Sequence, residues 1–196
     1  MMGTSYGIKP TLREKFQGTS LDTSVWTPFG LEFGSITVAN GECTITNTSN
    51  NSSAEIGMYT NVSFPIGMIL TVVSKNIDGR HSSVVGFGTS PYVPYPHARA
   101  TTACTWYSRA DVPNSTGSYN DENNNTGTIS GIHDNLTNYQ TFTIERVSST
   151  NVKFYRNGSL QWDLSGPVFA NDYPVYFSAD GWSPTNTIKI SGVVIK

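Results

Sequence analysis

The stretch NVKFYRNGSLQWDL, residues 151–164, decides the fold class that we expect for this chain. Val152 and Phe154 alternate with polar-tipped neighbours, which is the period of a β-strand with one buried face. Asn157 and Gly158 then supply the positive φ angles of a two-residue type I′ turn. The returning segment carries its apolar residues on one face, namely Leu160, Trp162 and Leu164. The stretch therefore predicts a β-hairpin.

The same alternation recurs along the chain, and no segment shows helical periodicity of any length. We expect further strands at MILTVVSK (68–75), buried on nearly both faces, and at QTFTIERV (140–147), PVYFSA (174–179) and TIKISGVVIK (187–196). Gly192 in the last strand marks a bulge. Many short strands between Gly, Asn and Pro turns are typical of an antiparallel sandwich or barrel. We therefore predict one all-β domain over residues 1–196, with residues 1–10 as an extended N-terminal arm.

Several interior positions can also be predicted. Trp26 and Trp162 are expected to fill the sandwich core, because large apolar side chains occupy such interiors. Cys43 and Cys104 both lie in expected strands, and we favour two buried free thiols over one disulfide bridge. The histidines are too scattered for the ligand spacing of a zinc site: His81, His97 and His133.

Two polar stretches are predicted to be exposed loops. NSTGSYNDENNNTGT (114–128) is the low-complexity segment of the chain, and NTSNNSS (47–53) is shorter. Asp121 and Glu122 in the first stretch offer the hard oxygen ligands that calcium prefers, so they are weak candidates for a metal site. Their spacing matches no EF-hand loop. We therefore favour a solvated loop and expect no cofactor.

The bulk composition excludes several function classes. Charged residues make up 13% of the 196 residues, the formal net charge is −2, and no basic stretch occurs, so we expect no nucleic-acid partner. No apolar run approaches the roughly 18 residues of a membrane span. Few lysines and many Asn, Ser and Thr residues are typical of extracellular proteins, yet the N-terminus lacks the apolar core of a secretory signal. We expect an excised extracellular domain or a protein released by cell lysis, such as a bacteriophage structural protein, and the Met-Met start favours the second.

Several motifs resemble those of the concanavalin A-like lectin/glucanase superfamily over nearly the whole chain. The opening FQGTSLDTSVW (16–26) has a Phe, a Gly turn, Leu-Asp and a Trp four residues after the Asp, as that superfamily commonly does. GECTI (41–45) and FPIGMILTVVSK (64–75) resemble its following strands, and YFSADGW (176–182) resembles a closing strand. The resemblance implies a jelly roll of two curved antiparallel sheets, with a concave face on which relatives bind or cleave polysaccharides.

The catalytic motif of the glucanases in that superfamily is absent. A retaining glycosidase needs two carboxylates about 5 Å apart, and the resemblance implies that both come from one strand, as Glu-x-Asp-x-x-Glu or Glu-x-Asp-x-Glu. The glutamates here stand in different segments, and His133 lacks the Gln of the alginate-lyase strand. Convergence of distant carboxylates, such as Glu55 and Glu145, stays open. We nevertheless expect no enzymatic activity, with a polysaccharide hydrolase or lyase as the alternative.

The loop SPYVPYPHAR (90–99) gathers aromatic and basic side chains in a chain that is otherwise poor in charge. Its prolines forbid a β-ladder and stiffen the segment, and a preorganised loop loses little entropy on binding. We predict a recognition surface, with sugar slightly ahead of protein contact and plain packing third. Successive residues of a strand point to opposite faces, so only one of Trp106 and Tyr107 can face the concave side. The candidate carbohydrate-binding residues are Tyr92, Tyr95, His97, Arg99, Trp106, Tyr107 and Trp182.

These observations favour a non-catalytic, lectin-like carbohydrate-binding module on an extracellular or virion surface, with a glycan or polysaccharide as its partner. The alternative is a structural or decoration protein of a bacteriophage particle or appendage. In that case the same loop would contact another copy of the chain or other virion subunits. No catalytic residue is assigned.

Overall fold

The computed structural model describes residues 11–51, 54–76, 83–88, 103–109, 114–123, 125–133, 138–181 and 185–196. These residues form β-strands and one 3₁₀ turn, η1 (Leu31–Phe33). The strands are β1 (Leu12–Glu14), β2 (Trp26–Phe29), β3 (Gly34–Ala39), β4 (Glu42–Asn47), β5 (Glu55–Phe64), β6 (Ile69–Asn76), β7 (Ser83–Gly88), β8 (Ala103–Arg109), β9 (Asn114–Asn120), β10 (Thr126–His133), β11 (Gln140–Ser148), β12 (Asn151–Arg156), β13 (Ser159–Ser165), β14 (Tyr173–Asp180) and β15 (Asn186–Ile195). The predicted all-β class is confirmed. The described part of the chain contains no helix of the length and hydropathy needed to span a membrane.

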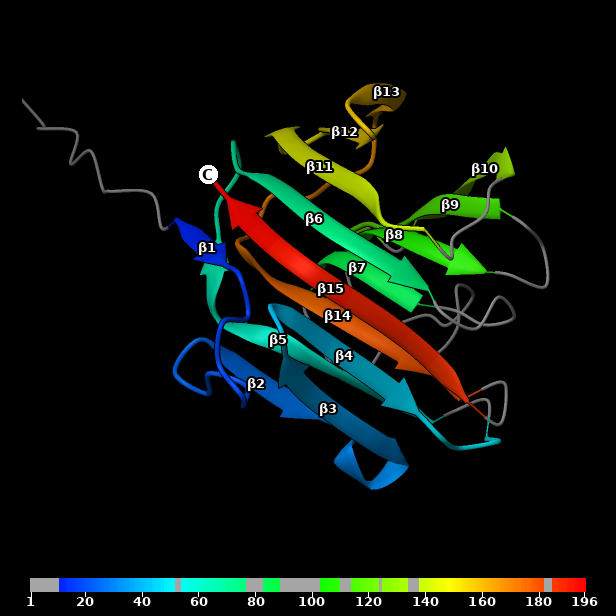
Figure 1. Ribbon diagram of the computed structural model, residues 1–196. Coiled ribbons are helices and arrows are strands. Elements are labelled where there is room, and N and C mark those ends of the chain that lie inside the picture. Colours follow the sequence, from blue (N-terminus) through cyan, green and yellow to red (C-terminus); the bar gives the residue numbers. More distant parts are fainter. Residues whose placement is uncertain are drawn as a thin grey trace, which may run out of the picture.

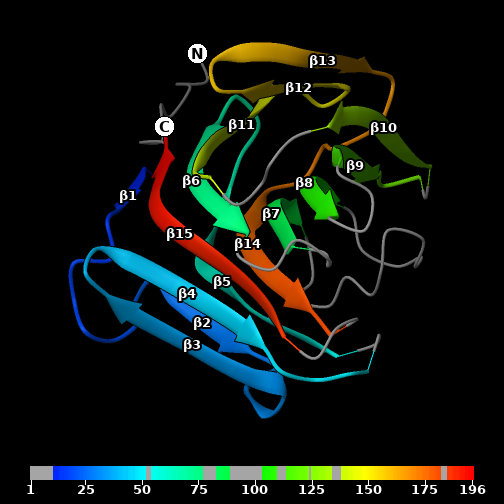
Figure 2. The same cartoon turned by 45° about the vertical axis from the view of Figure 1, so that its right-hand side comes forward.

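Two antiparallel sheets pack face to face (Figure 1). The eight-stranded sheet has the order β13-β12-β11-β6-β15-β4-β3, with β1 paired to β15, and the seven-stranded sheet has the order β10-β9-β8-β7-β14-β5-β2. Neighbouring strands are often far apart in sequence, as with β5 beside β14 and β6 beside β15. The seven-stranded sheet lies inside the curve of the eight-stranded one (Figure 2), so its outer face is the concave face. This is the predicted two-sheet jelly-roll sandwich.

The two inner faces share one hydrophobic core. Trp26 is fully buried, with its ring centroid 6.3 Å from that of Phe16 and 5.4 Å from that of Phe177, as its predicted core role requires. Trp162 is half-buried and packs against the core from β13. On β6 one face is buried and the other is half-buried, so this strand is less enclosed than we predicted. Aromatic and aliphatic side chains of both sheets thus fill the space between them.

The two cysteines lie in this core as free thiols, which confirms the favoured prediction. Burial raises the pKa of both Cys43 and Cys104 to about 12. Both thiols are therefore protonated at neutral pH and poorly reactive, since the thiolate is the nucleophile.

The hairpin and the bulge form where the sequence predicts them. Asn157 and Gly158 have φ angles of 48° and 81°, which are the left-handed values of the tight turn between β12 and β13. The register of β15 against β6 shifts between Ile190 and Gly192, which is the expected bulge.

The polar stretch 114–128 is not the long loop that we predicted. It supplies β9 and the start of β10, which pair antiparallel around a turn closed by the Asp121 N–H to the Asn125 carbonyl. β9 also pairs with β8 along its whole length. Ladder hydrogen bonds come from the backbone, so Ser, Thr, Asn and Gly can extend a sheet at its margin although their side chains favour turns.

One buried cation ties three segments together at an end of the sandwich. The Arg146 guanidinium is fully buried and donates hydrogen bonds to the carbonyls of Phe64, Phe169 and Asn171, at 2.7, 3.0 and 2.5 Å. It also lies over the ring of Tyr173, with its central carbon 4.6 Å from the ring centroid. Carbonyl oxygens and an aromatic face thus replace water around this charge.

Candidate functional site

The concave face of the seven-stranded sheet carries the most unusual set of polar side chains in the described structure. Along β14, Tyr176, Ser178 and Asp180 alternate with residues that pack into the core, so they belong to the concave face. Glu55 and Tyr59 of the adjacent β5 lie on the same face by the same alternation. We call these five residues the concave site.

Aromatic rings form the floor of the concave site. Tyr176 is 1% exposed and makes, with Val84 of β7 and the packed Tyr59, a small apolar cluster separate from the main core. The ring of Phe29 on β2 lies 6.4 Å from that of Tyr59. Gly86 of β7 pairs directly with Tyr176, and a Cβ there would meet the backbone of β8. The floor thus combines aromatic rings with a position where only glycine fits, an arrangement suited to a flat ligand.

Two hydroxyl groups in this floor are buried and have no hydrogen-bond partner among the described residues. They are the Tyr176 hydroxyl, which lies near Thr105 but outside hydrogen-bond geometry, and the Ser178 hydroxyl. Burial raises the pKa of Tyr176 well above its usual value, and the nearby charge of Glu55 adds to the effect. Most buried polar groups in native proteins are paired, so two unpaired hydroxyls on one strand indicate a place for a polar ligand.

Two acidic residues stand directly opposite each other in the strand register beside these hydroxyls. Asp180 and Glu55 are direct cross-strand partners in the β14–β5 pairing. The Cβ atoms of directly opposed residues lie roughly 4.5–5.5 Å apart in antiparallel sheets. Glu55 is 5% exposed, and the Asn186 side-chain amide donates to the Asp180 Oδ1 at 3.3 Å and to its backbone carbonyl at 3.2 Å. The strand register thus brings together two acids that are far apart in sequence.

Most of the predicted carbohydrate-binding residues lie outside the described residues: Tyr92, Tyr95, His97, Arg99 and Trp182. Their proposed role stays a prediction. The backbone of Tyr107 lies in β8, where it pairs with Val84 of β7 and Thr116 of β9. Tyr107 is therefore in the sheet that carries the concave site.

Trp106 has a core position instead of an exposed one. It is 2% exposed, and its ring centroid lies 5.0–5.7 Å from those of Phe142, Phe154 and Trp162 of the opposite sheet. Its indole N–H donates to the carbonyl of Thr143 at 3.2 Å. A ring enclosed in this way has no free face for a sugar, so we remove Trp106 from the candidate binding residues.

The two weak metal candidates use their carboxylates to hold the chain. Asp121 accepts hydrogen bonds from the backbone N–H groups of Asn123, Asn125 and Val168, at 2.7–3.0 Å, and from the Asn125 side chain. Glu122 accepts from Tyr173 and from the backbone of residue 171. Burial raises the pKa of both acids, but these hydrogen bonds outweigh it and leave both pKa values lowered. Among the described residues no cluster of three potential metal ligands occurs, and calcium binding stays an untested prediction.

The distant pair that we considered for catalysis does not converge. Glu145 lies on the outer face of the eight-stranded sheet, where its Oε2 accepts a hydrogen bond from the Tyr155 hydroxyl at 2.7 Å. Glu55 lies on the outer face of the other sheet. The core separates the two.

Comparisons with known proteins place the fold. The sequence matches no protein-family model and no curated protein. Solved structures match over nearly the whole chain at low identity. A prokaryotic β-1,3-1,4-glucanase (lichenase) from a mouse hindgut metagenome has a TM-score of 0.70 at 10% identity, covering 95% of this chain and 98% of its own. A Bacillus licheniformis β-glucanase gives 0.70 at 11%, with 95% and 97% covered. The catalytic domain of a Thermotoga petrophila endo-1,3-β-glucanase (laminarinase) gives 0.65 at 15%, with 96% and 98% covered. The chain thus has the concanavalin A-like jelly-roll fold that its motifs predicted.

These comparisons correct our prediction that the chain is not an enzyme. Several of the similar solved structures are described as glucanases, one as a lichenase and one as a laminarinase, and the match covers 92–98% of each. That prediction rested on the absence of two carboxylates on one strand. The β5–β14 register supplies a pair from two strands.

The concave site was missed in the sequence, although one signal was present. The segment YFSAD (176–180) alternates polar and apolar residues, so its polar members share one face of the strand. Nothing local indicates that Glu55 would lie opposite Asp180, because that pairing depends on the order of strands in the sheet.

Proposed function

We propose that this chain is a carbohydrate-active enzyme that binds a polysaccharide across the concave face and hydrolyses it with Glu55 and Asp180. The observation that carries the proposal is the register pair of carboxyl groups beside two buried, unpaired hydroxyls. The glucanase names of similarly folded structures support the same class of substrate.

The expected geometry suits hydrolysis with retention of configuration. Retaining glycosidases hold two carboxyl groups about 5–5.5 Å apart. Directly opposed residues start from Cβ atoms roughly 4.5–5.5 Å apart, from which their carboxyl groups can reach that separation. We assign Asp180 as nucleophile, because the Asn186 amide fixes one of its oxygens. Asp180 attacks the anomeric carbon while Glu55 gives its proton to the departing glycosidic oxygen. Glu55 then takes a proton from water, and that water oxygen displaces Asp180 from the sugar.

The aromatic floor and the hydroxyls position the sugar in this scheme. Tyr59, which is only partly buried, presents ring surface for the C–H face of a pyranose, and the buried Tyr176 and Ser178 hydroxyls lie in the floor of the same face. The chemistry takes place on rigid strands, which favours precise placement of the reacting atoms.

Reducing-sugar assays on laminarin, lichenan, xylan and mucin glycans test the proposal. Glu55→Gln and Asp180→Asn should each lower turnover by about 10²–10⁴-fold, because each removes one partner of an acid and nucleophile pair. Glu145→Gln is the matched control, since this acid lies on the opposite outer face and bonds to Tyr155. Wild-type protein that binds one of these glycans but releases no reducing ends would contradict the catalytic part. Turnover unchanged in both variants would remove these residues from it.

Polysaccharides of this size are met outside the cell, and we propose an extracellular or particle-surface location on that ground.

The lectin-like and virion roles remain distinguishable in the same assays. Binding without turnover would indicate a lectin-like module. Neither binding nor turnover, with a defined oligomer in solution, would favour an assembly role.

A further inference from the structure

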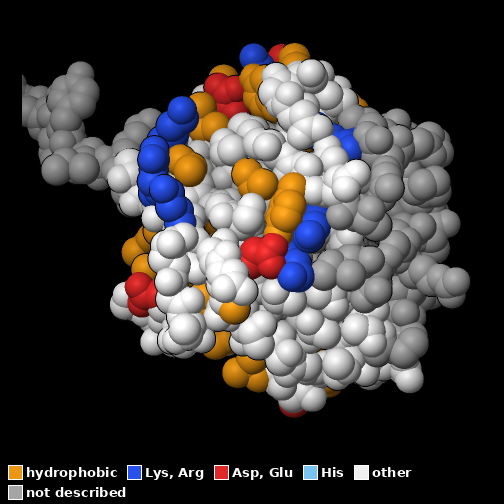
Figure 3. All heavy atoms as spheres, viewed as in Figure 1, with side chains coloured by type: hydrophobic (Ala, Val, Ile, Leu, Met, Phe, Trp, Pro, Cys, Tyr) orange, Lys and Arg blue, Asp and Glu red, His pale blue; other side chains and the backbone are white. Residues whose placement is uncertain are grey.

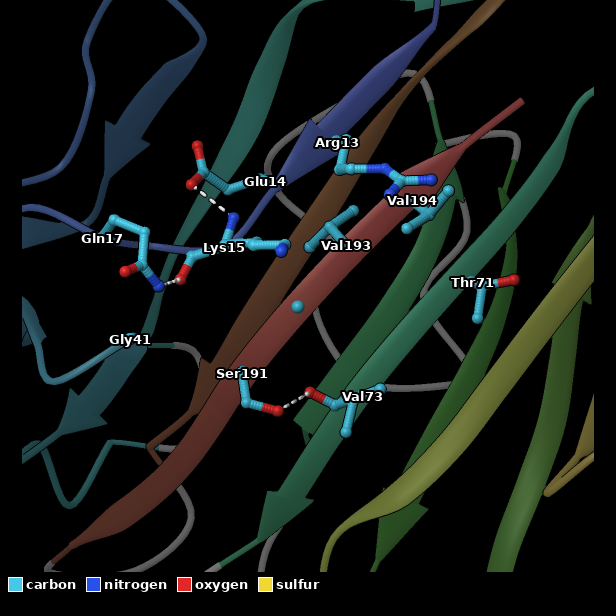
Figure 4. Close-up of a pocket in the computed structure, with 11 residues that line it drawn as sticks. Arg13, Glu14, Lys15, Gln17, Gly41, Thr71, Val73, Ser191, Val193 and Val194 are labelled. Carbon is cyan, nitrogen blue, oxygen red and sulfur yellow. Dashed lines mark hydrogen bonds between the residues drawn. The ribbon is translucent and has the colours of Figure 1, made fainter.

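A groove of about 340 Å³ lies on the other side of the molecule, on the outer face of the eight-stranded sheet. Figure 4 shows its lining residues, which come from β1 and the following segment, from β15 and from β6. The groove exists because two strands share one edge of β15. β4 pairs with Asn186–Ile190 and β1 pairs with Val193–Ile195, so Ser191 and Gly192 have neither strand beside them.

The rim of the groove is cationic. Arg13 and Lys15 are exposed; the Arg13 side chain extends from β1 across β15, and that of Lys15, the residue after β1, points toward β15 (Figure 4). The acid between them is engaged elsewhere, since Glu14 Oε1 accepts the backbone N–H groups of Lys15 and Phe16 at 2.8 and 2.6 Å. Among the described residues neither cation has an ion-pair partner within 4 Å. Basic side chains accordingly gather over β1 on this face of the molecule (Figure 3).

The floor of the groove is amphipathic. Val73 and Val194 supply a half-buried aliphatic surface, and Ser191 supplies a hydroxyl beside it. The Thr71 hydroxyl contacts that of Thr143 at 3.2 Å, and the Gln17 amide donates to the Lys15 carbonyl at 3.2 Å, which leaves the Gln17 side-chain oxygen as an acceptor. The Ser191 hydroxyl makes only a long contact of 3.4 Å to the Val73 carbonyl, so it can turn toward a ligand. A ligand for this groove should therefore combine an anionic group, several hydroxyls and a C–H face.

We propose that this groove is a second carbohydrate site, which binds an acidic sugar residue through its carboxylate or sulfate group. An Arg fork and a Lys ammonium together match such oxyanions. The volume is that of a small-ligand site, of the order of one or two sugar rings. The groove lies on the sheet opposite to the concave site, so this proposal does not depend on whether the concave site hydrolyses a glycan.

A titration of the full chain tests the proposal, with binding measured by calorimetry and amide NMR. The ligands are trigalacturonate, a sulfated disaccharide, cellotriose and sodium sulfate. Either or both acidic sugars should bind, with shifts centred on Ser191, Gly192 and Val194, and which of them binds distinguishes carboxylate from sulfate. Arg13→Ala with Lys15→Ala should weaken binding at least about tenfold, since charge-assisted contacts are lost. Lys153→Ala is the control, a cation of the same outer face that pairs with Asp163.

A groove-filling variant distinguishes binding inside the groove from nonspecific attraction of an anion to the two cations. Gly192 lies in strand β15 without a left-handed φ, and a Cβ there would meet only the Glu14 carbonyl, at 3.9 Å. Gly192→Leu should thus fold normally and keep both cations, yet abolish the binding. Equal binding by Gly192→Leu and wild type, or equal affinity for cellotriose, would overturn the proposal. If inorganic sulfate binds as tightly as the sugars, the groove holds an adventitious ion only, and the proposal is wrong.

Discussion

The two outer faces of this sandwich differ in whether their polar side chains have hydrogen-bond or ion-pair partners. On the eight-stranded sheet they pair across strands: Lys189 with Glu42 at 2.8 Å, and Tyr155 with Glu145 at 2.7 Å. On the seven-stranded sheet the hydroxyls of Tyr176 and Ser178 are buried and have no partner in the part of the chain that the structure describes. A paired face is stable by itself, whereas an unpaired one keeps its hydrogen-bonding capacity for a ligand. The difference supports the concave site as the place of the proposed substrate, and three measurements test it.

The largest effect should come from glycines at matched places on the two faces. Gly86→Ala should lower the free energy of unfolding by about 1–3 kcal/mol, because the new Cβ would lie 2.6 Å from the Cα of Thr105. Gly192→Ala should change it by less than about 0.5 kcal/mol, since its Cβ would meet only the Glu14 carbonyl, at an ordinary contact distance of 3.9 Å. Urea denaturation followed by tryptophan fluorescence measures both. Equal losses would show that the concave face is no more tightly built than its counterpart.

A smaller effect should separate the two tyrosine hydroxyls. Tyr155→Phe removes a hydrogen bond to Glu145 and should lower stability by about 0.5–1.5 kcal/mol. Tyr176→Phe removes an unpaired buried hydroxyl, so stability should stay constant or rise by up to about 1 kcal/mol, while glycan binding weakens. Thermal unfolding and a binding titration on the same samples give both values. A clear loss of stability in Tyr176→Phe would mean that this hydroxyl has a partner in the folded chain.

The smallest effect concerns alkaline titration. The hydrogen bond to Glu145 raises the pKa of Tyr155 above 10, so its contribution to stability is complete below pH 10 and is lost as pH rises through the folded value. Burial raises the pKa of Tyr176 further, so it should ionise only as the protein unfolds. Absorbance near 295 nm should show the Tyr155 step moving toward pH 10 in Glu145→Gln. An unmoved step in that variant would exclude the hydrogen bond as its cause.

The sequence predicted those parts of the fold that depend on residues close together in the chain. The turn at Asn157 and Gly158 depends on backbone angles that those residue types favour, and the alternation around it fixes the buried face. The hairpin of β9 and β10 was missed because its pairing uses backbone groups, to which Ser and Asn side chains give no clue. Trp106 was ambiguous for another reason: alternation assigns it to one face of β8 but does not say which face is inward.

The candidate site was beyond local reasoning. Glu55 begins one strand and Asp180 ends another, and only the order of strands in the sheet makes them neighbours. Arg146 shows the opposite situation. Alternation along β11 assigns it to the same face as the buried Phe142 and Ile144, so its burial was implied although its charge argues against it.

The guanidinium of Arg146 has a consequence for the redox conditions under which this fold is stable. It joins the end of β5 to the segment before β14 through carbonyls of Phe64, Phe169 and Asn171, which is the role that a cross-link has in many small exported domains. A protonated side chain needs no oxidant to form this connection and no reductant can open it. Because Cys43 and Cys104 are both free thiols, the chain should reach the same folded state, with the same melting temperature, in reducing cytoplasm and in oxidising surroundings.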